Sequence, residues 1–316
     1  MASGTMRAVV VAKDAPGKLA IRETPKPAPR LGEALVKVAA VSLNRGETRR
    51  ALSMADNGWI PGWDFAGTVE TPASDGSGPR AGARVVGLVA DGAWAEYVAA
   101  PTPVLAELPR SVSFAAASTL PVAGLTALHA LAKGGLLLGR KVLIGGATGG
   151  VGSFACQLAR LSGAHVVAAI RNREHESLVK RLGADEAAVG ADVGAAASLG
   201  PFHLVLESVG GPSLAAAIRM LAPGGTCVLF GVSGAAETTF DARELFRIGA
   251  ASLYGLILFD EIQREPAGIG LARLGRLIAD GKLKPAIEVE ARWTEVAGVA
   301  ARLIERRFTG KAVLTF

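Results

Sequence analysis

A glycine-rich segment near the middle of the chain has the composition and spacing of a phosphate-binding turn. Gly145–Gly152 reads Gly-Gly-Ala-Thr-Gly-Gly-Val-Gly and lies between an apolar run and a helix-like pattern. Gly149 can let the backbone approach a pyrophosphate, and Gly152 can let the helix pack closely on the strand. The helix N-terminus then offers free N–H groups to the phosphates. The alternative is a glycine-rich turn of some other α/β protein. The expected dinucleotide contacts are Ala147, Thr148, Gly149, Gly150 and Val151.

Two arginines follow the next apolar run, at the position that distinguishes NAD from NADP. The run His165–Ile170 continues as Arg171-Asn-Arg173, and the first acidic residue is Glu174. An enzyme that takes NAD usually has an Asp or Glu here for the ribose hydroxyl. Two guanidiniums can instead hold a ribose 2′-phosphate through charge-assisted, bidentate hydrogen bonds. The pattern therefore predicts NADPH, and the alternative is a pair of ordinary surface arginines before a helix.

The elements that position these residues form an alternating pattern. The runs Lys141–Gly146, His165–Ile170, Leu204–Glu207 and Cys227–Phe230 predict strands. Apolar residues at helical spacing predict the helices between them, so a parallel sheet with right-handed crossovers is expected. The helix faces consist of Val151, Phe154, Ala155 and Leu158 in one case, and of Leu214, Ala217, Ile218 and Leu221 in the other.

The first hundred residues have a different sequence pattern, in which short Val-rich runs are separated by residues typical of turns. They predict a compact β-barrel-like domain, and the strand-like tail Ala312–Phe316 predicts that the chain returns to it. The fold class is therefore α/β, with a barrel domain from residues 1–112 and 260–316 and a doubly wound domain from residues 113–259. The predicted barrel strands are Ala8–Val11, Ala34–Val38, Gly67–Glu70, Arg84–Val89 and Trp94–Val98.

Composition excludes several classes of protein. The 316 residues are half apolar, and their formal charge of +6 is spread without a Lys/Arg block, so no nucleic-acid partner is expected. Two cysteines are too few for a disulfide framework or a multi-thiolate zinc site and fit a cytoplasmic setting.

The uncharged stretch Ser113–Ala132 contains Pro121 and Gly124, so a linker with a buried helix is expected, not a membrane span. No signal peptide is expected. Met1 and Met6 are both open as the natural start, and in the second case Met1–Thr5 is an added, non-native segment.

Several motifs in order resemble the zinc-free quinone oxidoreductase branch of the medium-chain dehydrogenase/reductase superfamily. The resemblance covers about Met6 to Phe316 and implies a GroES-like barrel joined to a Rossmann domain, with the active site in the cleft between them. It rests on Pro61-Gly-Trp-Asp-Phe-Ala-Gly67, Leu120-Pro-Val-Ala-Gly-Leu-Thr-Ala127, Gly145–Gly152, Leu182-Gly-Ala-Asp185, Glu207-Ser-Val-Gly-Gly211 and Gly281-Lys-Leu-Lys-Pro285.

The resemblance assigns further cofactor contacts to matched positions. Asn44 and Thr126 would lie near the nicotinamide and its ribose, although Asn44 could cap a turn and Thr126 could bond within its helix. Phe230 could instead belong to the core, and Ser208 could simply begin a turn. The residues expected along the adenosine and nicotinamide path are Ser208, Val209, Phe230 and Gly231. His175 stands where many NADPH-using relatives carry a phosphate-binding lysine, and the alternative is a solvated histidine.

Departures from the family pattern bear on the chemistry. Zinc-dependent relatives place Cys after the Asn44 region and Gly-His-Glu where this chain has Gly62-Trp63-Asp64, so no metal is expected. Many relatives carry Asp where this chain has Glu47, and some carry a tyrosine shortly after it. Because no tyrosine precedes Glu96, the proton donor is left open.

The expected reaction is hydride transfer to a quinone or an α,β-unsaturated carbonyl compound. Conjugation spreads the incoming negative charge onto the carbonyl oxygen, where one hydrogen-bond donor can stabilise it. Asn44, Arg45 and Thr126 are the catalytic candidates. Trp59 and Trp63 are expected either to contact a flat substrate or to belong to the barrel core. The apolar run Ala250–Phe259 predicts an edge strand that pairs in a homodimer. Two other functions remain open, a specialised enoyl reductase in a biosynthetic pathway and a non-catalytic NADPH-binding protein.

Overall fold

Strand-forming segments from the two ends of the chain build one β-rich unit, and the middle of the chain builds another. The computed structural model describes residues 4–316, and the segment Met1–Thr5, whose native status the sequence leaves open, falls partly outside them. Contacts divide the chain into a barrel unit, up to Leu125 and from Ile262 to Phe316, and a sheet unit, Thr126–Glu261. The expected boundaries fell after residues 112 and 259.

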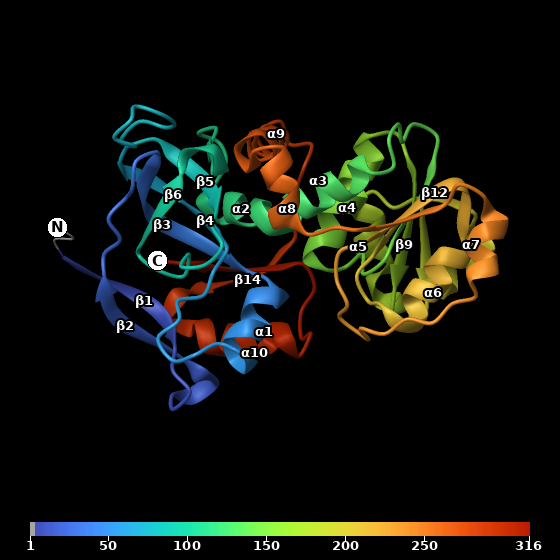
Figure 1. Ribbon diagram of the computed structural model, residues 1–316, viewed down its shortest axis with the longest axis horizontal. Coiled ribbons are helices and arrows are strands. Elements are labelled where there is room, and N and C mark those ends of the chain that lie inside the picture. The colour runs from blue at the N-terminus through green and yellow to red at the C-terminus, as the bar shows by residue number, and fades with distance from the viewer. Residues whose placement is uncertain (1–3) are drawn as a thin grey trace. The chain divides into compact units, whose positions relative to one another are not determined.

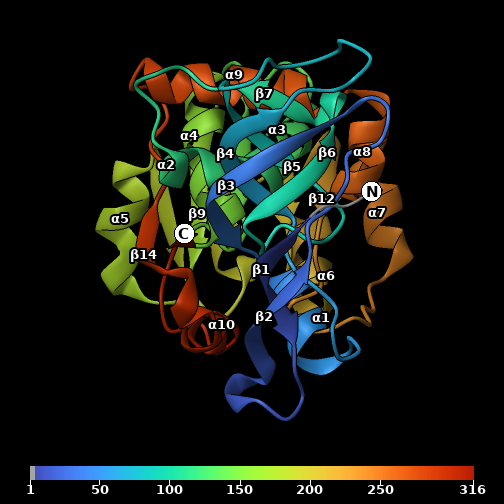
Figure 2. The same cartoon turned by 90° about the vertical axis from the view of Figure 1, so that its left-hand side faces the viewer.

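The barrel unit is built around a seven-stranded sheet with the order β14-β15-β3-β4-β5-β7, in which β6 also pairs with β3. Figure 2 shows the long strand β3 crossing this unit beside β4 and β6, with the β1–β2 ribbon below them. The strands of the unit are β1 (Thr5–Val11), β2 (Leu19–Pro25), β3 (Glu33–Leu43), β4 (Asp64–Thr71), β5 (Arg84–Leu88), β6 (Tyr97–Pro101), β7 (Leu105–Glu107), β14 (Ile287–Arg292) and β15 (Lys311–Thr315).

Apolar strand faces and short helices enclose the core of the barrel unit. The core includes Phe65, Trp94 and Trp293, together with the apolar residues of β3 and β15. Strand β15 lies antiparallel to β3, so the predicted return of the chain to the barrel is confirmed. The helical segments are α1 (Arg45–Ser53), α2 (Phe114–Ser118), the π-helical turn η3 (Leu120–Gly124), α8 (Leu258–Arg264), α9 (Ala267–Ala279) and α10 (Val296–Ile304). Short helical turns lie at Pro16–Lys18, Thr102–Val104 and Trp293–Glu295. Helix α8 includes the second boundary between the units, which falls after Glu261.

The sheet unit contains six parallel strands in the order β10-β9-β8-β11-β12-β13, which confirms the predicted parallel sheet. Figure 1 shows helices α4 to α7 around these strands. The elements are α3 (Leu125–Ala132), β8 (Lys141–Ile144), α4 (Gly150–Leu161), β9 (His165–Ile170), α5 (Glu176–Arg181), β10 (Glu186–Val189), β11 (Phe202–Glu207), α6 (Gly211–Arg219), β12 (Leu221–Leu229), α7 (Ala242–Ile248) and β13 (Ser252–Gly255), with short helical turns at Arg173–His175 and Val193–Leu199.

Three details of the predicted pattern were wrong. Leu221 begins β12 and does not belong to the preceding helix, because α6 ends at Arg219. Strand β6 begins at Tyr97, so Trp94 precedes it as a fully buried loop residue. The run Ala250–Phe259 supplies only the short strand β13, and α8 starts within the run at Leu258. Apolar character alone did not separate a strand from a buried helix start.

The uncharged stretch Ser113–Ala132 folds as α2, η3 and α3, three short helical segments. In the part of the chain that the structure describes, no helix is long and apolar enough to cross a membrane.

Candidate functional site

The carboxyl edge of the parallel sheet gathers the predicted cofactor residues of the sheet unit. Strand β8 lies in the middle, with β9 on one side and β11 on the other, so the direction of strand order reverses there. In open α/β sheets, ligands bind outside the carboxyl ends of the strands at this switch point. The loops that follow β8, β9, β11 and β12 hold the glycine turn, Arg171, Ser208 and Phe230, respectively.

The glycine turn leaves the first turn of α4 without a capping side chain. Gly149 is the N-cap in an extended conformation, and its own N–H donates to the Gly146 carbonyl at 2.9 Å. A Cβ at Gly149 would lie 3.3 Å from that same oxygen, so the backbone there is tightly folded. The first N–H groups of a helix lack intrahelical partners, and here no side chain accepts from them. This geometry fits the pyrophosphate of a dinucleotide.

The loops after β11 and β12 lie against the glycine turn. A Cβ at Gly146 would lie 3.6 Å from the Ser208 Oγ, and a Cβ at Gly231 would lie 3.4 Å from the Ser208 Cβ. Val209 follows in the same loop and donates its N–H to the buried Glu207 carboxylate, which also accepts from Ser213 Oγ at 2.8 Å. Ser208 therefore lies close to both Gly146 of the turn and Gly231, while Val209 and Phe230 follow β11 and β12 in the same two loops.

The two arginines after β9 are exposed, and among residues 4–316 neither guanidinium has an ion-pair or hydrogen-bond partner. Glu174 lies beside them but is 71% exposed at its side chain and lies 3.6 Å from His175 Nε2. Unpaired guanidiniums at this strand end fit a phosphate on the adenosine ribose. His175 precedes α5 as its N-cap, so it belongs to the same loop.

Thr126 begins the sheet unit near the start of α3 and is 5% exposed. The neighbouring hydroxyls of Ser118 and Thr119 donate back to the carbonyls three residues earlier, at 2.9 and 2.7 Å. In the described part of the chain, the Thr126 hydroxyl makes no such bond, so the alternative of a bond within its helix does not apply. The hydroxyl therefore retains both a donor and an acceptor for a ligand.

Asn44 lies in the barrel unit at the centre of a buried polar network. Its Nδ2 donates to Asp64 Oδ2 at 2.8 Å and to Glu47 Oε1 at 3.2 Å, and its Oδ1 accepts from Lys311 Nζ at 2.5 Å. Lys311 Nζ also donates to the Leu43 carbonyl at 3.0 Å and lies 3.6 Å from Asp64 Oδ2. The amide of Asn44 therefore has a defined orientation, with its nitrogen toward two carboxylates and its oxygen toward an ammonium.

The two carboxylates of this network are held from several elements. Glu47 caps α1, accepting from the Asn44 N–H at 2.8 Å and from the Trp63 N–H at 2.7 Å. Asp64 accepts from Ser42 Oγ at 2.7 Å and from the Val122 N–H of η3 at 2.9 Å. Strands β3, β4 and β15 and the segments α1 and η3 therefore meet at these groups.

Burial dominates the acid–base properties of the network. It raises the pKa of the Glu47 carboxyl well above its usual range, and the nearby Asp64 raises it further. It also raises the pKa of Asp64, although the Lys311 ammonium opposes that effect. It lowers the pKa of Lys311, against the attraction of the two carboxylates. Desolvation disfavours each charged form, and the attraction between opposite charges and the hydrogen bonds within the network partly compensate for it.

Arg45, Trp59 and Trp63 have structural contacts within the barrel unit. Arg45 Nη1 donates to the Leu303 carbonyl at 2.9 Å and thus binds the C-terminal turn of α10. The Trp59 ring packs on the core beneath the Arg50 guanidinium, which lies 4.5 Å from the ring centroid. The Trp63 ring lies over the backbone next to Asn44, where a Cβ at residue 46 would come within 2.6 Å of its Cη2. Their catalytic and substrate roles stay predictions.

A second lysine–carboxylate pair lies in the sheet unit, with a buried Glu261 and a partly exposed Lys133. Lys133 Nζ of α3 donates to Glu261 Oε2 of α8 at 2.8 Å, and Tyr254 of β13 donates to the other oxygen. His129 Nδ1 lies 3.9 Å from the same carboxylate. The Lys133 side chain is 24% exposed, whereas the Lys311 side chain is 3% exposed, so the two lysines differ in burial.

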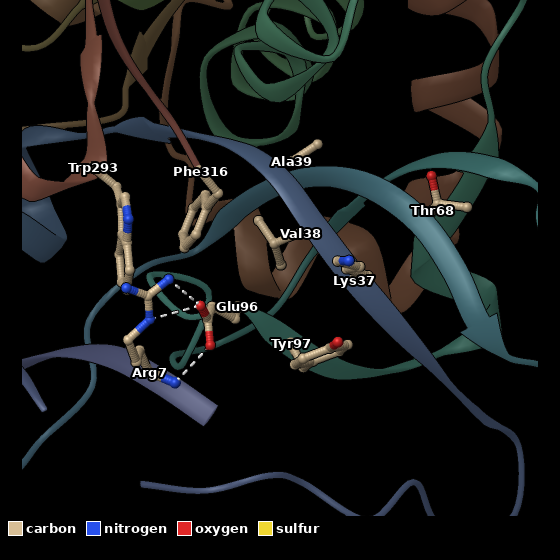
Figure 3. Close-up of a pocket in the computed structure, with 9 residues that line it drawn as sticks. All are labelled: Arg7, Lys37, Val38, Ala39, Thr68, Glu96, Tyr97, Trp293 and Phe316. Atoms are coloured by element: carbon tan, nitrogen blue, oxygen red, sulfur yellow. Dashed lines mark hydrogen bonds and ion pairs between the residues drawn. The ribbon is translucent and has the colours of Figure 1, made fainter. Parts of the chain in front are cut away.

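The barrel unit also has a surface cavity of about 460 Å³. Figure 3 shows Arg7 held by Glu96 below the Trp293 ring, with Lys37 and Tyr97 on the far side. None of the predicted site residues lines it. Within residues 4–316, no group of three or more His, Cys, Asp or Glu side chains is arranged to hold a metal ion.

Sequence reasoning assigned no role to Lys311 and noted Glu47 and Asp64 only as departures from a family pattern. Asp64 and Lys311 are charged residues that begin β4 and β15, and each is followed by a run of uncharged residues. A charge in such a run is a signal of a buried pair, because an unpaired charge is rarely buried. The pairing of residues so far apart along the chain could not be read from the sequence.

Two family descriptions match different parts of the chain. Residues 30–110 match the alcohol dehydrogenase GroES-like domain, and residues 150–272 match the family described as zinc-binding dehydrogenase. With the parallel sheet, these matches confirm the expected fold class of a GroES-like domain and a Rossmann-like domain.

Similar proteins cover nearly the whole chain. A chloroplast envelope quinone oxidoreductase homolog of Arabidopsis thaliana is 30% identical over 312 residues, which span 92% of each protein. A mycobacterial protein solved in complex with NADPH is 26% identical, covers 98% of this chain and 100% of its own, and superimposes with a TM-score of 0.87. The spectinabilin polyketide synthase system protein NorB of Streptomyces orinoci is 35% identical over 90% of this chain, which spans only 13% of NorB.

Proposed function

This chain belongs to the medium-chain dehydrogenase/reductase superfamily, in its quinone oxidoreductase-like branch, and on that premise we propose that it is an NADPH-dependent reductase of quinones or α,β-unsaturated carbonyl compounds that works without zinc. The observation that carries the proposal is the carboxyl edge of the parallel sheet. An uncapped helix N-terminus and a tight glycine turn meet the pyrophosphate, and two unpaired guanidiniums follow the neighbouring strand.

The preference for NADPH over NADH rests on charge. Arg171 and Arg173 offer bidentate donors to a 2′-phosphate, and the first acid in the loop, Glu174, is drawn toward His175. The superimposable mycobacterial protein binds NADPH, which supports the same cofactor here.

The chain's own residues position the reactants. When bound, the reduced nicotinamide supplies a hydride to the β-carbon of the acceptor. The acceptor's carbonyl oxygen gains charge during that step and needs a donor, and the Thr126 hydroxyl has a hydrogen to offer. Solvent then provides the proton that completes the reduction. The zinc-free part of the proposal rests on the departures from the pattern of zinc-dependent relatives, since this chain has neither a Cys after the Asn44 region nor a Gly-His-Glu in place of Gly62-Trp63-Asp64.

Nucleotide titration and turnover test the proposal. Purified protein is titrated with NADPH and with NADH by fluorescence, and NADPH oxidation is then followed with 9,10-phenanthrenequinone and with a simple enone. Tighter NADPH binding with turnover of either acceptor is expected. Failure to bind either nucleotide would refute the central claim, and binding without turnover of any acceptor would favour the non-catalytic alternative. Metal analysis of the active protein tests the zinc-free claim.

A second candidate is an enoyl reductase of a biosynthetic pathway. The 35% identity to a segment of a polyketide synthase protein favours it, because an α,β-unsaturated thioester is an activated double bond like that of an enone. Crotonyl thioesters offered alongside the quinone and the enone separate the two candidates. Preference for the thioester by more than tenfold in kcat/KM would favour the enoyl reductase.

We further propose that the protein forms a homodimer through β13, the edge strand of the parallel sheet. β13 pairs only with β12 among the described strands, and it presents Leu253, which is 44% exposed. An unpaired apolar edge is a liability that pairing with a second copy removes.

A further inference from the structure

We infer that the surface cavity of the barrel unit, which lies over Ala39, is a binding site for a flat aromatic carboxylate that also bears a ring oxygen. The cavity has a volume of about 460 Å³ and is shown in Figure 3. Small-molecule sites have volumes of roughly 300–1,000 Å³. Every residue that lines it belongs to the barrel unit, so the inference goes beyond the proposed function and does not depend on it.

The cavity follows from the alternation of side chains along β3. Val36 and Val38 belong to the core of the barrel unit, so Lys37 and Ala39 lie on the opposite face of the strand. The Phe316 N–H donates to the Ala39 carbonyl at 3.2 Å, which places a large ring beside a small side chain. The space over the Ala39 methyl group is therefore left open between larger neighbours.

An aromatic wall with an unused donor borders one side of the cavity. The Phe316 and Trp293 rings stack with their centroids 4.5 Å apart. Trp293 is only 4% exposed, and its indole N–H has no hydrogen-bond partner within residues 4–316. The indole nitrogen of Trp94 is completely buried, whereas that of Trp293 keeps an accessible surface. Because a buried indole N–H usually finds a partner, this donor indicates a ligand acceptor in the cavity.

Lys37 supplies a positive charge on the far side, as Figure 3 shows. Its Cα pairs with those of Thr68 on β4 and Tyr97 on β6, so the three side chains form a row across the sheet. Among the described residues, the Lys37 ammonium has no hydrogen-bond or ion-pair partner, and the Thr68 hydroxyl has no hydrogen bond. Both groups can donate to a ligand.

The carboxylates near Lys37 are already paired with other cations. Glu96 accepts from Arg7 Nε and Nη2 at 2.9 and 2.7 Å and from the Arg7 backbone N–H at 2.8 Å. Glu70 pairs with Lys26, which lies over the outside of the Tyr97 ring. The charges of these two pairs cancel, so Lys37 leaves the cavity with an excess of positive charge.

This combination of groups selects the class of ligand. A flat ring fits over the Ala39 methyl group against Phe316, because aromatic rings favour offset stacking. A carboxylate accepts charge-assisted hydrogen bonds from the Lys37 ammonium, and an oxygen at the other end of the ring accepts from the Trp293 N–H. The excess positive charge disfavours a cationic ligand of the same shape.

Calorimetric titration of the full chain with 6-hydroxy-2-naphthoate, without any nucleotide, tests the inference. A Kd below about 1 mM is expected for a ligand of this size. Ala39→Leu fills the cavity without changing any charge and should raise the Kd by roughly tenfold or more. Ala99→Leu is the matched control, because Ala99 is a partly exposed alanine of β6 that does not line the cavity. It should leave the Kd within about twofold.

The two donors are tested separately. Lys37→Gln should raise the Kd of the carboxylate about three- to tenfold and leave that of the uncharged 6-hydroxy-2-naphthamide unchanged. Lys13→Gln removes an exposed lysine outside the cavity and controls for net charge. Trp293→Phe keeps a ring beside Phe316, and in this variant 6-hydroxy-2-naphthoate should bind no better than 2-naphthoate. Melting temperatures establish that each variant is folded, and if Ala39→Leu is not, the Lys37→Gln comparison decides.

NMR locates the bound ligand directly. The chain has four tryptophans, and the indole N–H signal that disappears in Trp293→Phe identifies Trp293. Addition of 6-hydroxy-2-naphthoate should shift that signal and leave the other three in place. A stationary Trp293 signal, undiminished binding in Ala39→Leu, or no binding at about 5 mM ligand would overturn the inference. None of these results requires NADPH, so failure of the proposed function would be seen separately.

Discussion

A Cβ atom at Gly152 would lie 2.3 Å from the carbonyl oxygen of Gly146 and 2.6 Å from the Cα of Ala147. The first turn of α4 thus contacts the backbone of the glycine turn directly, and no side chain fits between them.

Gly152→Ala should therefore force the helix and the turn apart. The atoms that it meets are backbone atoms, so we expect a loss of about 1–3 kcal/mol in the free energy of unfolding, together with a weaker NADPH affinity. Urea unfolding and fluorescence titration measure the two effects. Gly298→Ala in α10 is the control, since a Cβ there meets nothing within 4 Å. It should stabilise by about 0.5–1 kcal/mol. Unchanged NADPH binding in Gly152→Ala would contradict the assignment of the turn.

The guanidiniums after β9 should determine the preference for NADPH. Arg171→Ala and Arg173→Ala each remove charge-assisted hydrogen bonds to the 2′-phosphate, so the NADPH Kd should rise about ten- to a hundredfold. The NADH Kd should stay within about twofold. The exposed Arg181 of α5 supplies a control, Arg181→Ala, that lowers the net charge equally. An equal loss for both nucleotides would show that the arginines act on the common part of the cofactor.

Thr126 should supply the hydrogen bond to the acceptor. Its hydroxyl makes no bond within the described chain, unlike those of Ser118 and Thr119. Thr126→Val keeps the shape and removes the donor, so kcat should fall on the order of a hundredfold. Thr126→Ser retains the hydroxyl and should keep kcat within a few-fold of the wild type, as stopped-flow measurements can show. Equal kcat values for the Val and Ser variants would exclude this role.

The buried Glu47 carboxyl should make stability depend on pH in an unusual direction. Because burial raises its pKa in the folded protein, the folded state holds the proton more tightly than the unfolded chain does. Its contribution is complete below the ordinary value of 4.5 and is lost as the pH rises through the folded pKa. The wild type should therefore lose stability relative to Glu47→Gln as the pH increases above 4.5.

The contribution of Glu96 to the free energy of unfolding should depend on pH in the opposite direction to that of Glu47. Its partial burial favours a higher pKa, but hydrogen bonds from Arg7 outweigh burial and lower the pKa. Its contribution is present above 4.5 and is lost as the pH falls through the lowered pKa. Urea unfolding of Glu96→Gln against pH should show a difference that shrinks toward acid. For Glu47, free energies of unfolding that change with pH equally in the wild type and in Glu47→Gln would contradict its raised pKa.

The edge strand β13 should carry a dimer interface. Light scattering should give twice the chain mass of 32.2 kDa at micromolar concentration. Leu253→Lys should shift the protein toward the monomer, because a charge on an apolar edge opposes strand pairing. Leu138→Lys replaces another exposed leucine, 70% exposed and outside β13, and should leave the mass unchanged. A monomeric wild type would rule out the dimer.

Local pattern was sufficient to predict most of the sheet unit. The glycine turn, strand β9 and helix α4 are each specified by residues close in sequence, through apolar periodicity and glycine spacing. The start of α8 at Leu258 was missed because a short apolar run is compatible with either a strand or a helix. The predicted cofactor residues of this unit meet at one sheet edge because parallel strands share their carboxyl ends.

The network around Asn44 depends on pairings that no local pattern contains. Lys311 and Leu43 are 268 residues apart in sequence, yet the Lys311 ammonium donates to the Leu43 carbonyl. Only the antiparallel register of β15 on β3 brings them together. The same limit applies to Arg45, whose contact with the end of α10 could not be distinguished by sequence from a role in the site.

The pairing of β15 with β3 also affects the order in which the two units can fold during synthesis. The sheet unit lies wholly within the chain before Ile262, so its nucleotide-binding edge can form while the ribosome is still translating the C-terminal part of the barrel unit. Strand β3, made early, must wait for Ala312 to emerge and pair with Leu43. Until then the buried network lacks the Lys311 ammonium, which in the folded protein contacts Asn44 and Asp64. The sheet unit can therefore fold well before the barrel unit is complete.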